Sequence, residues 1–212
     1  MSAHLSLLRL DPDDKQVSVD MRDVSDLHRT IMSAFADLGG AGRARADLGI
    51  LYRLTVEGNQ LTLLVQSQVR PRWDNLPRGY LCEAPAVRPL EPLLDRIVQN
   101  SLWQFRLVAN ATVARDGRRH GLTRESDLVD WLIRRDEQLG ARVDAHGAGT
   151  FTARDLGDIR GRRRTDRITV RQASFEGMLQ TIDAAALKRA VLAGVGHARA
   201  YGCGLLSLAP VE

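Results

Sequence analysis

The stretch ILYRLTVEGNQLTLLVQS, residues 50–67, decides how the first half of this chain of 212 residues folds. Apolar and polar residues alternate on both sides of a turn at Glu57–Gln60. Such alternation is typical of strands that bury one face, and a short turn between two of them indicates a β-hairpin. The first half is therefore expected to contain an antiparallel sheet.

Further segments of the first half also carry recognisable patterns. They are a strand at 5–10, a helix at 25–40, an irregular Pro-rich stretch at 71–92 and a short helix at 93–98. The longer helix has apolar residues at i, i+4 and i+7, with Asp23 or Ser25 as its expected N-cap and Gly39–Gly40 as its expected end.

The second half repeats this order with little sequence identity to the first. Its expected elements are a strand at 102–113, an amphipathic helix at 123–140 with a capping site at Thr123–Ser126, strands at 143–154 and 168–182, a helix from Asp183 to Gly194 and a strand at 203–210. Strand, helix, hairpin, helix and strand is the order of a ferredoxin-like unit.

The expected fold class is α+β, with tandem ferredoxin-like (RRM-like) domains at 1–98 and 99–212. In each domain we expect an antiparallel sheet with helices on one face, which leaves the other face free for a partner.

The composition is that of a globular, basic protein. Hydrophobic residues make up 44% of the chain, and the net charge is +4 with a pI near 9.6. Arginine supplies nearly all of the positive charge, since Lys15 and Lys188 are the only lysines. Because arginine binds phosphate in a planar, bidentate way, this balance leans towards nucleic acid, although an arginine-rich genome would produce the same bias.

Cysteine usage and the N-terminal segment bear on where the protein works. Cys82 and Cys203 belong to no CxxC pair, so they predict neither a zinc site nor a disulfide framework. The N-terminal MSAHLSLLRLDPDD becomes polar too soon for a signal peptide, and no apolar run approaches the ~20 residues that span a bilayer. The expected location is a reducing cytoplasm.

The segment RDLGDIRGRRRTDRITVR, residues 154–171, is here called the basic run because it holds seven arginines against three aspartates. Like charges repel, so such a run is usually a solvated loop, here between two strands. It could equally present guanidinium groups to an RNA backbone or groove. The pattern favours neither reading over the other.

His28 lies on the opening turn of the first long helix. A helix N-terminus offers free N–H groups and a positive dipole end, which suit a phosphate. Imidazole titrates near neutral pH and can move a proton during RNA cleavage. The simpler alternative is a surface histidine without a role.

The chain closes with GVGHARAYGCGLLSLAP at 194–210, and residues 194–204 are here called the glycine-rich segment. Four glycines surround Arg199, which is more than a helix C-cap and a tight turn require. No G-K-[ST] follows, so the segment is not a P-loop.

These closing residues resemble the C-terminal glycine-rich signature of the repeat-associated RNA-binding superfamily. In particular they resemble the CasE family, the CRISPR repeat-cleaving endoribonucleases of the type I-E Cascade complex. Further stretches that match in the family's order are LHRTI at 27–31, WDNLPRGY at 73–80, FRLVANAT at 105–112 and SFEGMLQTID at 174–183.

The resemblance implies an enzyme that binds the stem-loop of precursor CRISPR RNA and cuts once at the 3′ base of the stem, which yields mature guide RNA. No metal or cofactor is expected. The upstream ribose 2′-OH attacks the adjacent phosphate and leaves a cyclic phosphate and a 5′-OH end. The enzyme is expected to be a monomer when free, to have no membrane partner, and to stay on its product beside other Cascade subunits.

The resemblance also implies roles for particular residues. His28 is the expected catalytic acid or base, and Ser25 stands where some relatives have a tyrosine, which leaves the second catalytic group open. Arg106 and Asn110 match a family stretch, and a structural role suits them at least as well. The expected RNA-binding residues lie beside His28, in the basic run and in the glycine-rich segment: Arg29, Arg160, Arg162, Arg163, Arg164, Arg167, Arg171, Arg199, Gly202 and Gly204.

Two other functions remain open. The chain could be a non-catalytic RNA-binding subunit of a CRISPR complex, which Ser25 favours and His28 opposes. It could also be a ferredoxin-like domain for a small molecule or a protein, in which case no nucleic acid would co-purify and no RNA hairpin would bind at low salt.

Overall fold

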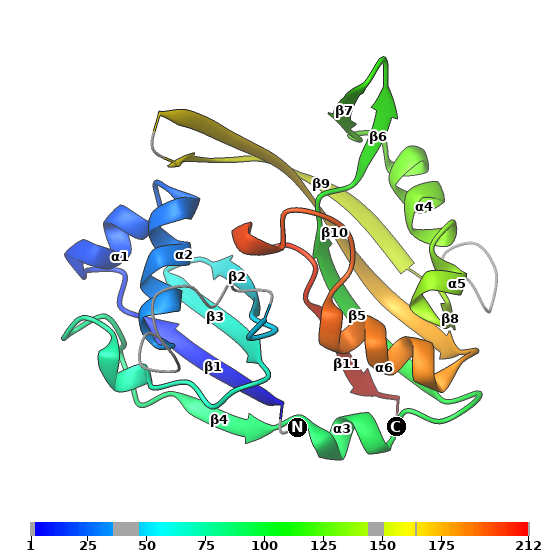
Figure 1. Cartoon of the computed structure of the whole chain (residues 1–212), viewed down its shortest axis with the longest axis horizontal. Coiled ribbons are helices and arrows are strands. Elements are labelled where there is room, and N and C mark those ends of the chain that lie inside the picture. Colours follow the sequence, from blue (N-terminus) through cyan, green and yellow to red (C-terminus); the bar gives the residue numbers. More distant parts are fainter. Residues whose placement is uncertain (1–2, 36–46, 144–150, 164, 212) are drawn as a thin grey trace. The chain divides into compact units, whose positions relative to one another are not determined.

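The computed structural model describes residues 3–35, 47–143, 151–163 and 165–211 (Figure 1). The chain divides into two compact units. The first consists of Met1–Leu90, Ile159–Thr169 and Ala200–Gly202, and the second of Glu91–Asp158, Val170–Arg199 and Cys203–Glu212. Both units are discontinuous along the chain, and the continuous domains 1–98 and 99–212 stay a prediction.

The first unit contains a four-stranded sheet in the order β2-β3-β1-β4. Its strands are β1 (His4–Leu10), β2 (Leu51–Glu57), β3 (Gln60–Ser67) and β4 (Ala86–Pro89). β3 lies between β1 and β2, and every pairing is antiparallel. The predicted first strand and the hairpin are confirmed. β4 was not predicted, because the Pro-rich composition of its segment indicated irregular structure.

Two helices precede β2 in the first unit. α1 (Lys15–Asp20) was not predicted, because six residues are too few to show a helical period. α2 (Val24–Ser33) has Asp23 as its N-cap, as expected, but ends before the predicted stop. That stop, Gly39–Gly40, lies outside the described residues.

The core of the first unit forms where α2 packs on one face of the sheet. Strand register aligns Leu8 with Leu63, and both side chains are buried. Leu27 and Ile31, one helical turn apart on α2, are buried in the same cluster. Because they are four residues apart, both lie on one side of the helix. The other sides of α2 can therefore contact elements outside the sheet.

The segment that follows β3 is less regular. It contains the 3₁₀ turn η1 (Trp73–Asn75), where Trp73 contacts Phe35 edge-on at 6.0 Å between ring centroids. The short helix expected at 93–98 is observed slightly earlier as α3 (Glu91–Asp95).

The second unit is built on a sheet in the order β11-β5-β10-β8, with β9 also paired to β10. These strands are β5 (Leu102–Ala109), β8 (Ala141–Arg142), β9 (Phe151–Arg163), β10 (Asp166–Thr181) and β11 (Leu206–Pro210). As in the first unit, the last strand, β11, flanks the first, β5, and the strand before the last, β10, lies on the other side of β5. The two sheets therefore share the ferredoxin-like order, which confirms the predicted α+β fold class.

The strand predicted at 102–113 is in fact interrupted. After β5 the chain enters a separate hairpin of β6 (Thr112–Arg115) and β7 (Arg118–Gly121). Asp116 and Gly117 both have positive φ, at 51° and 71°, which is the backbone that a two-residue hairpin turn requires.

The helices of the second unit are α4 (Glu125–Ile133), α5 (Asp136–Leu139) and α6 (Ala184–Ala193). The helix predicted at 123–140 is therefore two helices, and the capping site expected at Thr123–Ser126 is wrong: among the described residues no side chain caps α4, whose N-cap is Arg124. α6 confirms its prediction, since Asp183 accepts a hydrogen bond from Ala186 N at 3.0 Å.

The basic run is not a loop between strands, as one of the two readings had it, but forms both arms of the β9–β10 hairpin. Strand pairing satisfies the backbone polar groups, so charged side chains can project into solvent from a regular strand. Five arginines follow this pattern and are exposed, namely Arg154, Arg160, Arg162, Arg163 and Arg167, whereas Arg171 is partly buried. The predicted strands at 143–154 and 168–182 were therefore misplaced at the ends that face the turn, and residues 144–150 lie outside the described part.

Candidate functional site

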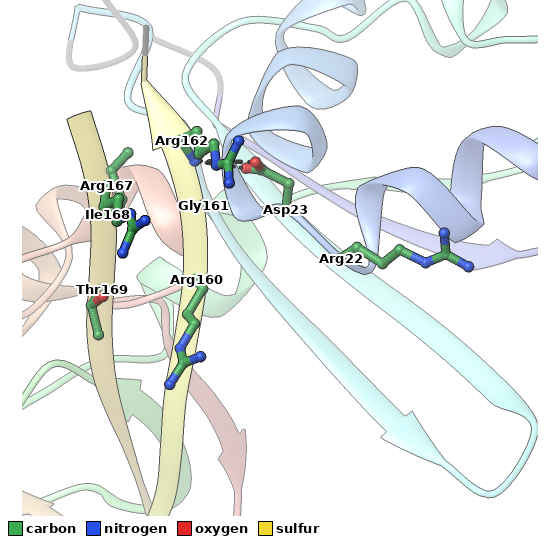
Figure 2. Close-up of a pocket in the computed structure, with 8 residues that line it drawn as sticks. All are labelled: Arg22, Asp23, Arg160, Gly161, Arg162, Arg167, Ile168 and Thr169. Carbon is green, nitrogen blue, oxygen red and sulfur yellow. Dashed lines mark hydrogen bonds between the residues drawn. The ribbon is translucent and has the colours of Figure 1, made fainter. Parts of the chain in front are cut away.

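Asp23 joins the first turn of α2 to the β9–β10 hairpin. Its Oδ1 accepts a hydrogen bond from Ser25 N at 2.8 Å, which caps the helix. The same carboxylate accepts from the backbone N of Arg162, at 3.3 Å to Oδ1 and 3.1 Å to Oδ2 (Figure 2). The far part of the hairpin thus belongs to the first unit, held at the start of the helix that carries His28.

Gly161 permits this close approach. A Cβ at this position would lie 2.6 Å from Asp23 Oδ1, 2.9 Å from Val24 Cγ2 and 3.0 Å from Ser25 Oγ. Any side chain would force β9 away from α2. Ser25 Oγ is buried by this packing and has no hydrogen-bond partner in the described part of the chain.

Beside this junction lies a cavity of about 510 Å³, here called the arginine pocket. It is lined by residues of the first unit only: Arg22, Asp23, Arg160, Gly161, Arg162, Arg167, Ile168 and Thr169. Figure 2 shows Arg160 and Arg167 on the two different strands of the hairpin. Four arginines and one aspartate line the pocket, and this excess of positive charge suits a phosphate, which arginine can bind through two parallel hydrogen bonds.

His28 follows Asp23 by five residues on α2, which corresponds to about 7.5 Å along the helix axis. The imidazole is partly buried and lies beside the ring of Tyr201, with 6.4 Å between ring centroids and planes at 66°. Tyr201 is part of the 3₁₀ turn η2 (Arg199–Tyr201) in the glycine-rich segment. The hydroxyl of Tyr52 donates to the carbonyl of Ala200 at 2.8 Å and holds this turn against β2.

The structure thus brings together three stretches that the sequence pattern singled out: the start of α2, the basic run and the glycine-rich segment. Sequence reasoning missed Arg22 of the arginine pocket and Tyr201. Tyr201 was part of the quoted closing stretch, but a single aromatic residue among glycines carried no signal that it would meet His28.

Other predicted RNA-binding arginines near this site are exposed. Arg29 forms an ion pair with Asp26 at 2.7 Å, and 74% of its side chain remains accessible. Arg163 is exposed at the end of β9. Arg164 lies outside the described residues.

Arg171 and Arg199 have structural partners. The guanidinium of Arg171 binds the carboxylates of Asp155 and Asp158, and this contact holds the pKa of the Asp155 carboxyl below its usual range. Arg199 donates to the carbonyls of Gly196 at 3.0 Å and Ala193 at 2.8 Å, which closes the C-terminal end of α6. Their contact with RNA stays a prediction.

Gly202 and Gly204 are buried, with φ of 74° and 91°. A Cβ on Gly204 would lie 2.9 Å from the carbonyl oxygen of Val195. The backbone geometry of the segment therefore accounts for these glycines without a ligand. Asn110 likewise has a structural contact, since its Nδ2 donates to the carbonyl of Arg171 at 2.7 Å.

Three further findings concern a buried thiol, metal sites and membrane-spanning helices. Burial raises the pKa of the Cys203 thiol to about 12. Across the ranges that the structure describes, no group of three or more His, Cys, Asp or Glu side chains is arranged to hold a metal ion. Within the same ranges, no helix is long and apolar enough to cross a membrane.

Two ferredoxin-like sheets, with an arginine pocket and an imidazole on the first unit, define an α+β protein of the tandem ferredoxin-like class with a candidate phosphate-binding site. A family model described as CRISPR associated protein matches residues 3–210. The chain belongs to this family, which confirms the resemblance drawn from its motifs.

Similar proteins refine this placement. The chain is 31% identical over 218 residues to the CRISPR-associated endoribonuclease Cse3 of Thermus thermophilus, covering 97% of this chain and 99% of the relative. It is 31% identical over 123 residues to the CRISPR system Cascade subunit CasE of Escherichia coli, covering 58% of this chain and 54% of the relative.

Solved structures agree with the sequence comparison. Thermus thermophilus Cse3 bound to an RNA representing a pre-cleavage complex matches with a TM-score of 0.83 at 28% identity, over 99% of this chain and all of that one. A subunit of a CRISPR RNA-guided surveillance complex matches with a TM-score of 0.64 at 29% identity, over 97% of this chain and 100% of that chain. Escherichia coli Cas6e, at 21% identity and a TM-score of 0.69, supports the fold.

Proposed function

We propose that this chain is a CRISPR-associated endoribonuclease that cleaves precursor CRISPR RNA at the base of the repeat stem-loop and produces mature guide RNA. The observation that carries the proposal is the arginine pocket at the N-terminus of the helix that bears His28. Similarity over nearly the whole chain to a protein named as an endoribonuclease supports it.

The substrate supplies the nucleophile in this reaction. The bond from the ribose 2′-oxygen to phosphorus forms as the bond from phosphorus to the 5′-oxygen breaks, which leaves a cyclic phosphate. One proton leaves the 2′-hydroxyl and one is gained by the 5′-oxygen. The protein therefore has to align the two oxygens and move protons, and an imidazole such as that of His28 is a side chain suited to accept or donate one.

Arg160, Arg162 and Arg167 hold the RNA backbone in this proposal. They line one pocket from two paired strands, and a paired strand fixes their spacing better than a loop would. Guanidinium groups at this position also stabilise negative charge that builds up on the reacting phosphate.

The protein acts in the cytoplasm and remains on its product as a subunit of a Cascade complex. Similarity to a subunit of an RNA-guided surveillance complex supports this part of the proposal. As a free protein it is a monomer. The second candidate function, RNA binding without cleavage, is favoured by the buried hydroxyl of Ser25, which occupies the position where some relatives have a tyrosine.

Replacement of His28 tests the catalytic assignment. We expect His28→Ala to bind the repeat hairpin with nearly unchanged affinity and to cleave it about 10²–10⁴-fold more slowly in EDTA, the range of a lost general acid or base. His120→Ala, at an exposed histidine of β7, is the matched control and should cleave normally. Binding without cleavage by the wild type would favour the non-catalytic function, and full cleavage by His28→Ala would refute the assignment of His28.

Replacement of the pocket arginines tests how the RNA is held. A triple variant, with Gln at 160, 162 and 167, should weaken hairpin binding and lower the slope of log affinity against log salt by about 0.9 per lost phosphate contact. Gln at Arg88, Arg142 and Arg189, which are exposed and lie outside the arginine pocket, removes the same charge and should leave the slope nearly unchanged. Equal slopes for the two triple variants would contradict RNA binding at the pocket.

A further inference from the structure

Tyr201 and His28 are far apart in the chain but share one place in the first unit. Their ring centroids are 6.4 Å apart, and the planes meet edge to face at 66°. A phosphate oxygen that accepts hydrogen bonds from two neighbouring groups lies about 2.7–3.0 Å from each donor atom. The separation of the two rings is therefore compatible with an imidazole and a phenol that contact one phosphate group.

The position of Tyr201 is fixed by its neighbours in the chain. Ala200 receives a hydrogen bond from the Tyr52 hydroxyl at 2.8 Å, so the turn is tied to β2, an edge strand of the sheet of the first unit. Gly202 continues the chain at a φ of 74°, a left-handed conformation that directs the backbone away after the turn. A ring held in this way needs little reorganisation before a reaction.

The other hydroxyl groups that the site could use have different roles. The chain has three tyrosines, and Tyr52 donates its hydroxyl to Ala200. Tyr80 donates to Asp20 at 2.7 Å inside the core, and burial together with this carboxylate raises the pKa of its phenol. Ser25 Oγ is buried behind Gly161. Tyr201 is thus the phenol that lies at His28.

A phenol suits the part of the reaction that the imidazole does not perform. Its ordinary pKa is about 10, so it is protonated at neutral pH and acts as a hydrogen-bond donor. As the 2′-oxygen attacks, negative charge is redistributed over the oxygens of the phosphate. A donor placed there in advance stabilises that charge without giving up its proton, so the proton balance of the reaction is unchanged.

We infer that Tyr201 is a second catalytic residue, whose phenolic O–H donates a hydrogen bond to an oxygen of the reacting phosphate beside His28. This inference rests on the proposed function as a ribonuclease. It assigns proton transfer to His28 and charge stabilisation to Tyr201.

Tyr201→Phe is the decisive variant, because it keeps the ring beside His28 and removes only the hydroxyl. Cleavage of the repeat hairpin is measured in single turnover with protein in excess, and affinity is measured separately with a hairpin that carries a 2′-deoxy group at the cut site. We expect cleavage to slow by about 10–100-fold, somewhat less than the loss of an enclosed oxyanion donor, with affinity changed less than about twofold. The pH–rate profile should keep its shape near neutrality, because Tyr201→Phe leaves the imidazole of His28 in place.

Tyr80→Phe removes a phenol elsewhere in the first unit and serves as the control, with melting temperatures measured for every variant. Normal cleavage by Tyr201→Phe together with slow cleavage by Tyr201→Ala would overturn the inference, since the ring alone would then matter. Loss of hairpin affinity in step with rate would overturn it as well. Failure of the wild type to cleave would reject the proposed function, whereas an inactive His28→Ala beside a fully active Tyr201→Phe would reject this inference alone.

Discussion

Asp23 performs two functions, and its replacement by alanine should remove both. The side chain caps α2 through Ser25 N at 2.8 Å and accepts from Arg162 N at 3.1 Å. Loss of an aspartate N-cap costs about 1 kcal/mol. The second contact is a hydrogen bond to a charged acceptor, worth about 1.5–3 kcal/mol when shielded and nearer 1 kcal/mol here because it is exposed to solvent. We therefore expect Asp23→Ala to lower stability by about 2 kcal/mol.

Asp183→Ala provides the control for the cap. Asp183 caps α6 through Ala186 N at 3.0 Å and has no contact with the β9–β10 hairpin among the interactions described. It should cost about 1 kcal/mol. With a shift of about 2–4 °C per kcal/mol for a chain of this size, Asp23→Ala should melt about 2–4 °C below Asp183→Ala in differential scanning fluorimetry.

Asp23→Asn provides the control for charge. Both substitutions at position 23 remove a negative charge beside the arginine pocket, which by itself favours RNA. Asparagine keeps Oδ1, which accepts from Ser25 N and from Arg162 N. Asp23→Ala should therefore bind the repeat hairpin about fivefold more weakly than Asp23→Asn, the equivalent of about 1 kcal/mol. Equal melting temperatures for Asp23→Ala and Asp183→Ala, with equal hairpin affinities for the two variants at 23, would refute the reasoning.

Three further outcomes follow from contacts described above. Cys82 is exposed whereas burial raises the pKa of Cys203 to about 12, so a thiol reagent at pH 8 should modify one cysteine in the native protein and two after denaturation; rapid reaction of both would contradict the burial. Arg171 lowers the pKa of Asp155, so the stability from this pair is complete above about pH 4, the ordinary value of the carboxyl, and is lost as pH falls through the lowered pKa. Urea titrations should show wild type and Asp155→Asn converging in stability below that pH, and a constant difference would be evidence against the pair. Gly161→Ala should reduce hairpin affinity and increase amide exchange in β9, because its Cβ would lie 2.6 Å from a carboxylate oxygen at the start of α2; wild-type affinity and exchange would show that the strand adapts.

Local patterns predicted the parts of the fold in which local and long-range preferences agree. The hairpin at 50–67 alternates because one face is buried, and α6 begins at Asp183 because that side chain caps it. The strands of the basic run were not predicted in this way. Its arginines show no apolar face, so the pattern left a solvated loop and an RNA-binding surface equally open. Pairing between β9 and β10 depends on backbone hydrogen bonds, which side-chain periodicity does not report.

In the candidate site, too, individual residues were predicted from the sequence but the contacts between distant residues were not. His28, Arg160, Arg162 and Arg167 were predicted from their residue types and from a family resemblance. The structure places the three arginines around one cavity, together with Arg22, which was not predicted. The contact between His28 and Tyr201 joins residues that are far apart in the chain, and so does the bond from Arg162 to Asp23. Contacts of this kind arise from the way the chain closes in three dimensions, and no local sequence window contains both partners.

The discontinuous composition of the first unit has a consequence for biosynthesis. Ile159–Thr169 and Ala200–Gly202 complete a body that begins at the N-terminus, and the ribosome adds them long after Leu90. A nascent chain released before residue 200 carries the helix with His28 but neither Tyr201 nor the turn that positions it. Translation products that stop before residue 200 are therefore unable to assemble this site, and guide-RNA processing awaits synthesis through residue 202.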